Sequence, residues 1–296
     1  MDEMEIKQQV RQFYDRVGWQ TVSDGMYQNA RYEDLRPVAH EYIHRCHLRV
    51  NRYLKPEGKY LLDAGSGPIQ YPEYLTYSQG YDYRVCVDIS IVALEEARKR
   101  IGQHGLFVVA DVANLPFKPG VFDGLVTLHT LHHLPSGDQP KAYQELYRVL
   151  MSGRSGVVVN GWTESSLMRR SRWLVNLMEQ LGSVLSHWTD PTANKIASEP
   201  AAAVVKPDPT GTFIKKQDAS SLREQLQGKM DFEIKVWRSV NVRFLRAVIH
   251  PQLGGRFLLK ILYSLEERFP SYFGKNGQYP LVVIRKPVHS ESEVSR

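Results

Sequence analysis

Between residues 59 and 162 the sequence alternates short apolar runs with longer amphipathic stretches, and this alternation leaves few folds open. Each run is rich in β-branched or aromatic residues, as strands buried on both faces are. Repeated strand-then-helix units return the chain in parallel and place helices on both faces of one sheet. The sequence therefore predicts an α/β fold with strands at 60–64, 84–88, 106–110, 122–128 and 156–160.

Two helices of this core carry recognisable boundary residues. Ser90 is predicted to cap a helix that ends at Gly102, because apolar residues recur on one helical face between them. Asp138 is predicted to cap a second amphipathic helix.

The rest of the chain divides around this core. Residues 1–55 contain helical stretches rich in aromatic side chains and are predicted to form an N-terminal helical cap. Residues 56–296 are predicted to form the main domain, with its core at 59–161. Two later strands are expected near 232–240 and 281–286, and two helical insertions at 162–231 and 241–278.

Composition restricts the class of protein further. The chain of 296 residues is 42% hydrophobic and 24% charged, which is typical of a folded globular protein. No segment approaches the roughly 20 apolar residues needed to cross a bilayer, so we expect no stable membrane insertion. Two cysteines, Cys46 and Cys86, are too few for a disulfide framework, and we expect a reducing, cytoplasmic location.

The positive charge of the chain is dispersed. The net charge is +6, but the densest basic groups are Arg169-Arg170-x-Arg172 and Lys215-Lys216. Groups this short are typical of a solvated surface, so we expect no nucleic-acid partner.

The strongest motif is an apolar strand that ends in a carboxylate and enters a glycine turn, Leu61-Leu62-Asp63-Ala64-Gly65-Ser66-Gly67-Pro68. Small residues let the backbone approach a ligand closely at the carboxyl end of a strand. Dinucleotide-binding folds use a similar turn, but here Gln70 replaces their third glycine and Asp63 would repel a pyrophosphate. A cationic ligand fits the turn better.

Two further carboxylates end the next two predicted strands. Asp88 follows Gly67 by 21 positions (88 − 67), where a carboxylate can accept hydrogen bonds from both hydroxyls of a ribose. Asp111 could accept from an exocyclic adenine amine, with Ile89 and Val112 on either side of the ring. Three carboxylates at neighbouring strand ends therefore predict a nucleoside site.

In these motifs the chain resembles the class I S-adenosylmethionine-dependent methyltransferases, and within them the small-molecule group that includes quinone-biosynthesis enzymes. The resemblance covers about a third of the chain. It rests on five segments: Leu62-Asp63-Ala64-Gly65-Ser66-Gly67, Val87-Asp88-Ile89-Ser90, Ala110-Asp111-Val112-Ala113-Asn114-Leu115-Pro116-Phe117, Phe122-Asp123-Gly124-Leu125-Val126 and His132-His133-Leu134-Pro135.

The resemblance implies a doubly wound, Rossmann-like, seven-stranded sheet whose last strand is antiparallel, and S-adenosylmethionine as the cofactor. It implies that Asp63 and Gly65 hold the methionine end, Asp88 the ribose and Asp111 the adenine amine. Pro68-Ile69-Gln70 departs from the family, which has a further glycine here. The residues expected to contact the cofactor are Tyr14, Asp63, Ala64, Gly65, Ser66, Gly67, Asp88, Ile89, Asp111, Val112 and His129.

Methyl transfer from a sulfonium is an in-line displacement that needs alignment and exclusion of water. A general base is required only if the acceptor must lose a proton. His129 is the candidate catalytic base, and the alternative is a packing or hydrogen-bonding residue beside the cofactor. No metal is expected, since His129, His132 and His133 have no suitable cysteine or acidic partner nearby.

Aromatic residues supply the candidate acceptor site. Tyr14, Trp19, Tyr27 and Tyr32 either close over the cofactor and the acceptor or belong to the core. Trp162 either lines the acceptor pocket or packs between elements.

The sequence also restricts the acceptor. Methyltransferases of base amines generally carry an Asn/Asp-Pro-Pro-aromatic motif where this chain has Leu128-His129-Thr130-Leu131, and no Pro-Cys nucleophile is present. We therefore expect a small-molecule acceptor, lipid-like or aromatic.

Two other functions remain open at this stage. One is an NAD-dependent oxidoreductase, which Asp63 and Gln70 disfavour. The other is a cofactor-binding protein whose apolar helical stretch 244–273 contacts a partner or the surface of a membrane.

Overall fold

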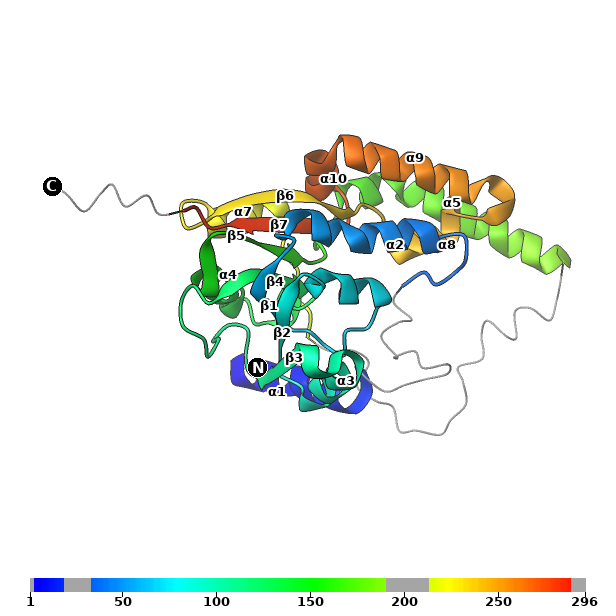
Figure 1. Ribbon diagram of the computed structural model, residues 1–296. Helices are drawn as coiled ribbons and strands as arrows, with labels where there is room; N and C mark the ends of the chain where they lie inside the picture. The colour runs from blue at the N-terminus through cyan, green and yellow to red at the C-terminus, as the bar shows by residue number, and fades with distance from the viewer. Residues whose placement is uncertain (1–2, 19–32, 190–212, 289–296) are drawn as a thin grey trace.

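A computed structural model of the chain describes residues 3–18, 33–189 and 213–288 (Figure 1). Within these residues one seven-stranded sheet has the order β3-β2-β1-β4-β5-β7-β6. Strand β7 is antiparallel to β5 and β6, and the other neighbouring pairs are parallel, which confirms the predicted sheet. The strands are β1 (Gly58–Ala64), β2 (Tyr81–Asp88), β3 (Gly105–Val109), β4 (Phe122–Leu128), β5 (Leu150–Val159), β6 (Asp231–Arg238) and β7 (Tyr279–Arg285).

Helices cover both faces of the sheet, and a group of them extends beyond it (Figure 1). They are α1 (Glu3–Phe13), α2 (His40–Leu48), α3 (Ile91–Ile101), α4 (Asp138–Val149), α5 (Ser166–Thr189), α7 (Ala219–Leu226), α8 (Val242–Val248), α9 (Gly255–Arg268) and α10 (Pro270–Asn276). None of the helices in these described ranges combines the length and the apolar character required to span a bilayer.

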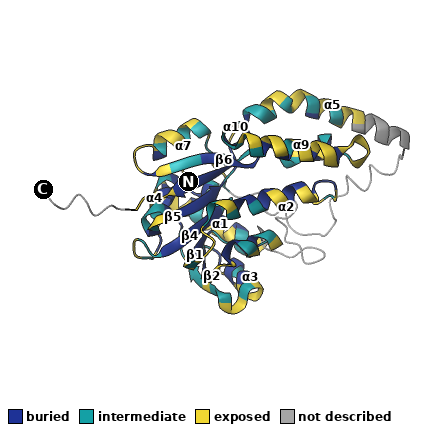
Figure 2. Ribbon diagram, turned by 45° about the horizontal axis from the view of Figure 1, so that its top comes forward, coloured by how far each residue is buried: buried dark blue, intermediate teal, exposed yellow. Residues whose placement is uncertain are grey.

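Alternate residues of each strand enter different cores. In β5, Val158 packs with α4 and α7 on one face, whereas Val157 and Val159 pack with α3 on the other. This two-residue period follows from the pleat of a strand. All of these valines are buried, as are most residues of the central strands (Figure 2).

The first 55 residues contribute to two separate places. Helix α1 lies near α3, whereas α2 packs against α9, where Tyr42 and Ile43 share a core with Leu259 and Tyr263 (Figure 1). The division of the chain at residue 55 stays a prediction.

One of the two predicted helix caps is present in the structure and the other is not. Ser90 caps α3, because its hydroxyl accepts a hydrogen bond from the Ala93 N–H at 3.2 Å, and Gly102 follows the helix with a positive φ of 51°. The prediction that Asp138 caps α4 is wrong. Gly137 is the cap residue, the N–H of Asp138 donates to the Pro135 carbonyl, and the Asp138 carboxylate binds lysines instead.

The carboxyl ends of the parallel strands lie at one edge of the sheet. Strand β7 is antiparallel to both β5 and β6, so β6 runs in the same direction as β1 to β5. The carboxyl ends of β1 to β6 and the start of β7 therefore lie at the same edge. The strand order reverses between β1 and β4, and ligands of such sheets bind at this point.

Candidate functional site

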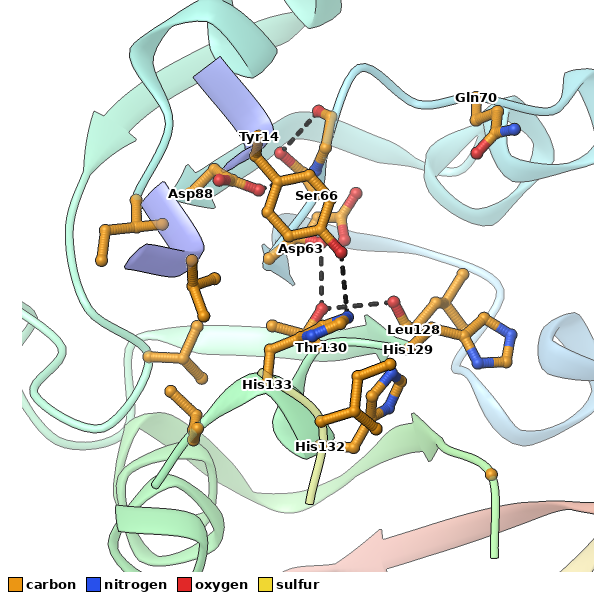
Figure 3. Close-up of a pocket in the computed structure, with 18 of the residues that line it drawn as sticks. Tyr14, Asp63, Ser66, Gln70, Asp88, Leu128, His129, Thr130, His132 and His133 are labelled. Atoms are coloured by element: carbon orange, nitrogen blue, oxygen red, sulfur yellow. Dashed lines mark hydrogen bonds between the residues drawn. The ribbon is translucent and has the colours of Figure 1, made fainter. Parts of the chain in front are cut away.

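A cavity of about 400 Å³ follows this edge of the sheet (Figure 3). Its walls come from the ends of all seven strands, from α1 and the turn after it, and from the segment just before α7. Every residue expected to contact the cofactor lines this cavity except Ala64, which is buried in the core beneath the turn.

The glycine turn after β1 forms the centre of the cavity. Gly65 has φ +73°, and its N–H donates to the Val87 carbonyl at 2.7 Å. A Cβ at Gly65 would lie 2.2 Å from side-chain atoms of Thr130, whose hydroxyl donates to the Gly65 carbonyl at 3.2 Å. No residue other than glycine fits this position without displacing the chain.

The departure at Pro68-Ile69-Gln70 has a structural consequence. Ile69 is fully buried and holds φ +56°, a conformation that a β-branched residue rarely adopts. Its side chain enters the core with α3, while Pro68 and Gln70 face the cavity.

Asp88 lies beside the turn, at the end of β2. Its carboxylate accepts hydrogen bonds from the backbone N–H groups of Gly67 and Ser90, each at 2.9 Å. Burial raises the pKa of Asp88 to about 6, although these two N–H groups oppose the shift. A carboxylate has about four lone-pair sites, so Asp88 retains capacity for a ligand's hydroxyl groups.

Asp111, at the end of β3, is already engaged by the N-terminal helix. The Lys7 ammonium lies 2.5 Å from an oxygen of Asp111 and 2.5 Å from an oxygen of Asp138. The other oxygen of Asp111 accepts from the Ala113 N–H at 2.9 Å. Lys7 therefore fastens α1 over the part of the cavity that Asp88, Ile89 and Asp111 form.

Asp63 does not present the free negative charge that its place before the turn suggested. Its carboxylate is buried and binds Arg84 of β2, with Nη2 at 2.5 Å and Nε at 3.0 Å from the same oxygen. The guanidinium neutralises the charge next to the turn, so the argument for a cationic ligand from Asp63 fails. Asp63 still lines the cavity.

Tyr14 closes the cavity from the side of α1 (Figure 3). Its hydroxyl lies 2.9 Å from Nε2 of His133, and Nδ1 of His133 lies 2.9 Å from the Phe213 carbonyl. Because a carbonyl only accepts, Nδ1 carries the proton and the Tyr14 hydroxyl donates to Nε2. Burial lowers the pKa of His133 to about 4, which keeps this ring neutral.

His129 follows β4 in a left-handed conformation, with φ +56°. Its N–H donates to the Val159 carbonyl at 2.7 Å, and its ring lies 5.0 Å from the Trp237 ring and 5.7 Å from the Tyr279 ring. Burial, with the positive charge of Arg238, lowers the pKa of His129 to about 3. The ring is neutral and weakly basic.

The third histidine of this region is His132. His132 lies with Nδ1 3.2 Å from the Asn160 side chain, and burial lowers its pKa. Among the residues that the structure describes, no group of three His, Cys, Asp or Glu side chains could hold a metal ion.

The far side of the cavity contains residues that the sequence did not indicate. Arg238 at the end of β6 is buried and paired with Glu33, whose pKa falls to about 2: burial opposes the shift, and the charge of Arg238 overcomes it. Aromatic rings and one further cation complete this wall: Tyr71, Tyr74, Trp237, Tyr279 and Lys216. The pair Lys215-Lys216 was the one available signal, and its interpretation as a solvated surface is wrong for Lys216.

The candidate acceptor residues have separate outcomes. Trp162 does not line this cavity, because it packs in the core with its indole N–H donating to the Gly274 carbonyl at 2.7 Å. Trp19, Tyr27 and Tyr32 lie outside the described residues.

The family model described as a methyltransferase domain matches residues 62–158. A malonyl-[acyl-carrier protein] O-methyltransferase of Legionella pneumophila is 31% identical over 121 residues, which are 40% of this chain and 42% of that protein. The match thus spans about two fifths of the relative's own length.

Two solved structures share the fold. The phosphoethanolamine N-methyltransferase 1 of Haemonchus contortus, solved with phosphoethanolamine and S-adenosylhomocysteine, has a TM-score of 0.55 at 10% identity and covers 98% of this chain and 51% of its own. The [4+2]-cyclase SpnF has a TM-score of 0.51 at 19% identity and covers 96% of this chain and 97% of its own. The family match identifies residues 62–158 as a methyltransferase domain, and the two solved structures show that the chain shares their fold.

Proposed function

We propose that the protein transfers the methyl group of S-adenosylmethionine to a small-molecule acceptor by in-line displacement. The observation that carries the proposal is one continuous cavity with two different ends, separated by the Gly65 turn. One end has the carboxylates and apolar residues that suit a nucleoside, and the other has aromatic and cationic side chains. Donor and acceptor would thus meet in line above the turn.

The residues present fit the cofactor. Gly65 leaves the backbone open where a Cβ would collide with Thr130, so the turn can approach the methionine end of the ligand. Asp88 has unused lone pairs for the ribose hydroxyls, and Asp111 keeps acceptor capacity beside its contact with Lys7. Ile89 and Val112 supply apolar contacts for the adenine ring.

The cofactor, when bound, supplies a methyl group that its sulfonium already activates. The chain's own residues align the reactants and exclude water, since Val10 and Phe13 of α1 and Tyr14 of the turn after it cover the cavity. With a pKa of about 3, His129 is a weak base, so we assign it to contact with the bound reactants. This favours an acceptor atom that reacts without losing a proton to the protein.

The relatives support methyl transfer without naming the acceptor of this chain. One is named for malonyl-[acyl-carrier protein] and another for phosphoethanolamine, which are chemically different substrates. SpnF is a cyclase, so the fold alone does not establish the reaction. A direct test is therefore necessary.

Isothermal titration calorimetry on the purified protein gives that test. We expect S-adenosylhomocysteine to bind and NAD to give no heat, whereas the reverse result would favour the oxidoreductase. Cell extracts incubated with enzyme and cofactor should then contain a compound whose mass has increased by one methyl group. Absence of binding by S-adenosylhomocysteine would remove the proposed function.

Asp88→Ala is expected to weaken S-adenosylhomocysteine binding by about 1.5–3 kcal/mol, the scale of hydrogen bonds to a charged group. The substitution also removes the acceptor for the Gly67 and Ser90 N–H groups. Asp82→Ala is the matched control, because Asp82 is an exposed aspartate of the same strand. Equal affinity of both variants would remove Asp88 from the site.

Binding of S-adenosylhomocysteine should also depend on pH. Hydroxyl donors favour the ionised form of Asp88, whose pKa is about 6, so affinity should rise about tenfold from pH 5 to pH 7. His129 and His133 remain neutral over this range, with pKa values of about 3 and about 4. Asp88→Asn should abolish the dependence in calorimetric titrations, and an unchanged pH profile in this variant would assign the effect to another group.

Two features support the remaining expectations about cellular context. Cys46 and Cys86 are buried and unpaired, which supports a reducing, cytoplasmic compartment. Helix α9 exposes Phe257, Leu258 and Ile261 beside exposed basic residues, which supports peripheral contact with an anionic membrane (Figure 2). Flotation with phosphatidylserine vesicles tests this contact, and protein that stays at the bottom of the gradient would exclude it.

A further inference from the structure

Most of the charged side chains that the structure places at the cavity have a partner of opposite charge, and the exceptions are Asp88 and Lys216. Three carboxylates have cationic partners: Glu33 binds Arg238, Asp63 binds Arg84 and Asp111 binds Lys7. Asp88 is held by backbone N–H groups. No hydrogen bond or ion pair joins the Lys216 ammonium to any residue that the structure describes, which makes Lys216 the uncompensated cation of the described wall.

The backbone fixes Lys216 in this position. The N–H of Thr163 donates to the Gln217 carbonyl at 2.9 Å, and the N–H of Lys215 donates to the His132 carbonyl at 2.7 Å. The Lys216 Nζ consequently lies only 3.3 Å from the point that a Cβ on Gly161 would occupy, at the end of β5. Burial lowers the pKa of Lys216, because the ammonium has lost water there without gaining a partner.

Two donors at the end of β6, on the same wall of the cavity, also lack acceptors. Trp237 Nε1 and Arg238 Nε are both fully buried, and neither has a hydrogen-bond partner among the described residues. Both residues line the cavity at the end of β6. A buried donor without an acceptor is costly, but neither nitrogen is exposed to the cavity, so Lys216 is the cation that a ligand can reach on this wall.

These donors lie away from the nucleoside end. In the sheet order, β5 is two strands and β6 four strands from β1, whereas β2 and β3 lie on the other side of β1. At about 4.8 Å between neighbouring strands, the end of β5 is about 10 Å from the glycine turn. The group that binds Lys216 would therefore belong to the acceptor.

We propose, on the basis of the proposed function, that the acceptor is an organic anion whose carboxylate or phosphate binds Lys216. Tyr71, Tyr74 and Tyr279 form an aromatic wall for the rest of the molecule. Charge-assisted hydrogen bonds in a partly buried site give the anion its preference over a neutral molecule of the same shape.

Calorimetry on the protein saturated with S-adenosylhomocysteine tests the proposal with three probes: 4-methylbenzoate, phenyl phosphate and the neutral 4-methylbenzamide. We expect one of the anions to bind at least about tenfold more tightly than the amide. Lys216→Met should remove this preference, and Lys216→Arg should retain most of it. Lys215→Met is the matched control, since Lys215 is the exposed neighbour, and it should behave as the wild type.

Three results would overturn the proposal: equal binding of anions and amide by the wild type, no binding of either anion at millimolar concentration, or an anion preference that survives in Lys216→Met. A loss of S-adenosylhomocysteine affinity in Lys216→Met would instead assign Lys216 to the cofactor. The comparison of the three probes on the wild type does not depend on whether any variant folds. Failure of S-adenosylhomocysteine to bind the wild type is a separate result, because it removes the proposed function itself.

Discussion

Replacing Gly65 by valine is expected to abolish binding of S-adenosylhomocysteine. The residue has φ +73°, and any Cβ there would lie 2.2 Å from Thr130. Relief of this collision would have to move either the turn that approaches the ligand or the segment that carries His129. Calorimetry should detect no heat with the variant, and thermal unfolding should show a folded protein.

Gly120→Val separates the collision from the backbone conformation. Gly120 has φ +65°, but no atom lies within 4 Å of the point where its Cβ would be. Both substitutions carry the backbone penalty of about 1 kcal/mol that a side chain adds in the left-handed region. Only Gly65→Val should fail to bind S-adenosylhomocysteine. Normal affinity in Gly65→Val would exclude the turn from the site.

The second large effect is expected at Asp63, on stability. Asp63→Ala should lower the free energy of unfolding by about 3–5 kcal/mol, because it leaves the Arg84 guanidinium buried without a counter-charge. Urea unfolding followed by tryptophan fluorescence measures the loss. A change below about 1 kcal/mol would show that the pair is not important for stability.

The double variant Asp63→Leu/Arg84→Met is the control for this prediction. It removes both charges and fills the space with apolar side chains, so it should recover most of the stability lost in Asp63→Ala. If the double variant is as unstable as the single one, the loss comes from packing at Asp63 and not from the unpaired charge.

The elements that the sequence predicted well depend on local patterns. Strand β4 covers the predicted residues 122–128, and α3 begins after Ser90 and ends before Gly102. Strand β5 begins earlier than predicted, at Leu150. The stretch Ser152-Gly153-Arg154-Ser155 interrupts the apolar pattern, but Leu150 pairs with Phe122 of β4. Local apolar periodicity cannot reveal a strand segment that long-range pairing stabilises.

The candidate site divides in the same way. The glycine turn and the carboxylates at the strand ends were visible in the sequence, since each is set by a few consecutive residues. The partners of Asp63 and Asp111 were not visible. Arg84 is 21 positions from Asp63, and Lys7 is 104 positions from Asp111.

The sequence by itself determined the α/β layering, the parallel direction of the core strands and the glycine turn with carboxylates at the neighbouring strand ends, because each of these features depends on a short stretch of chain. Only the tertiary structure decided which carboxylates keep a free charge and which residues form the opposite wall. Trp237, Arg238 and Lys216 reach that wall because β6, β7 and the segment before α7 pack onto the same edge of the sheet. Such contacts depend on how distant segments meet, and no local pattern encodes them.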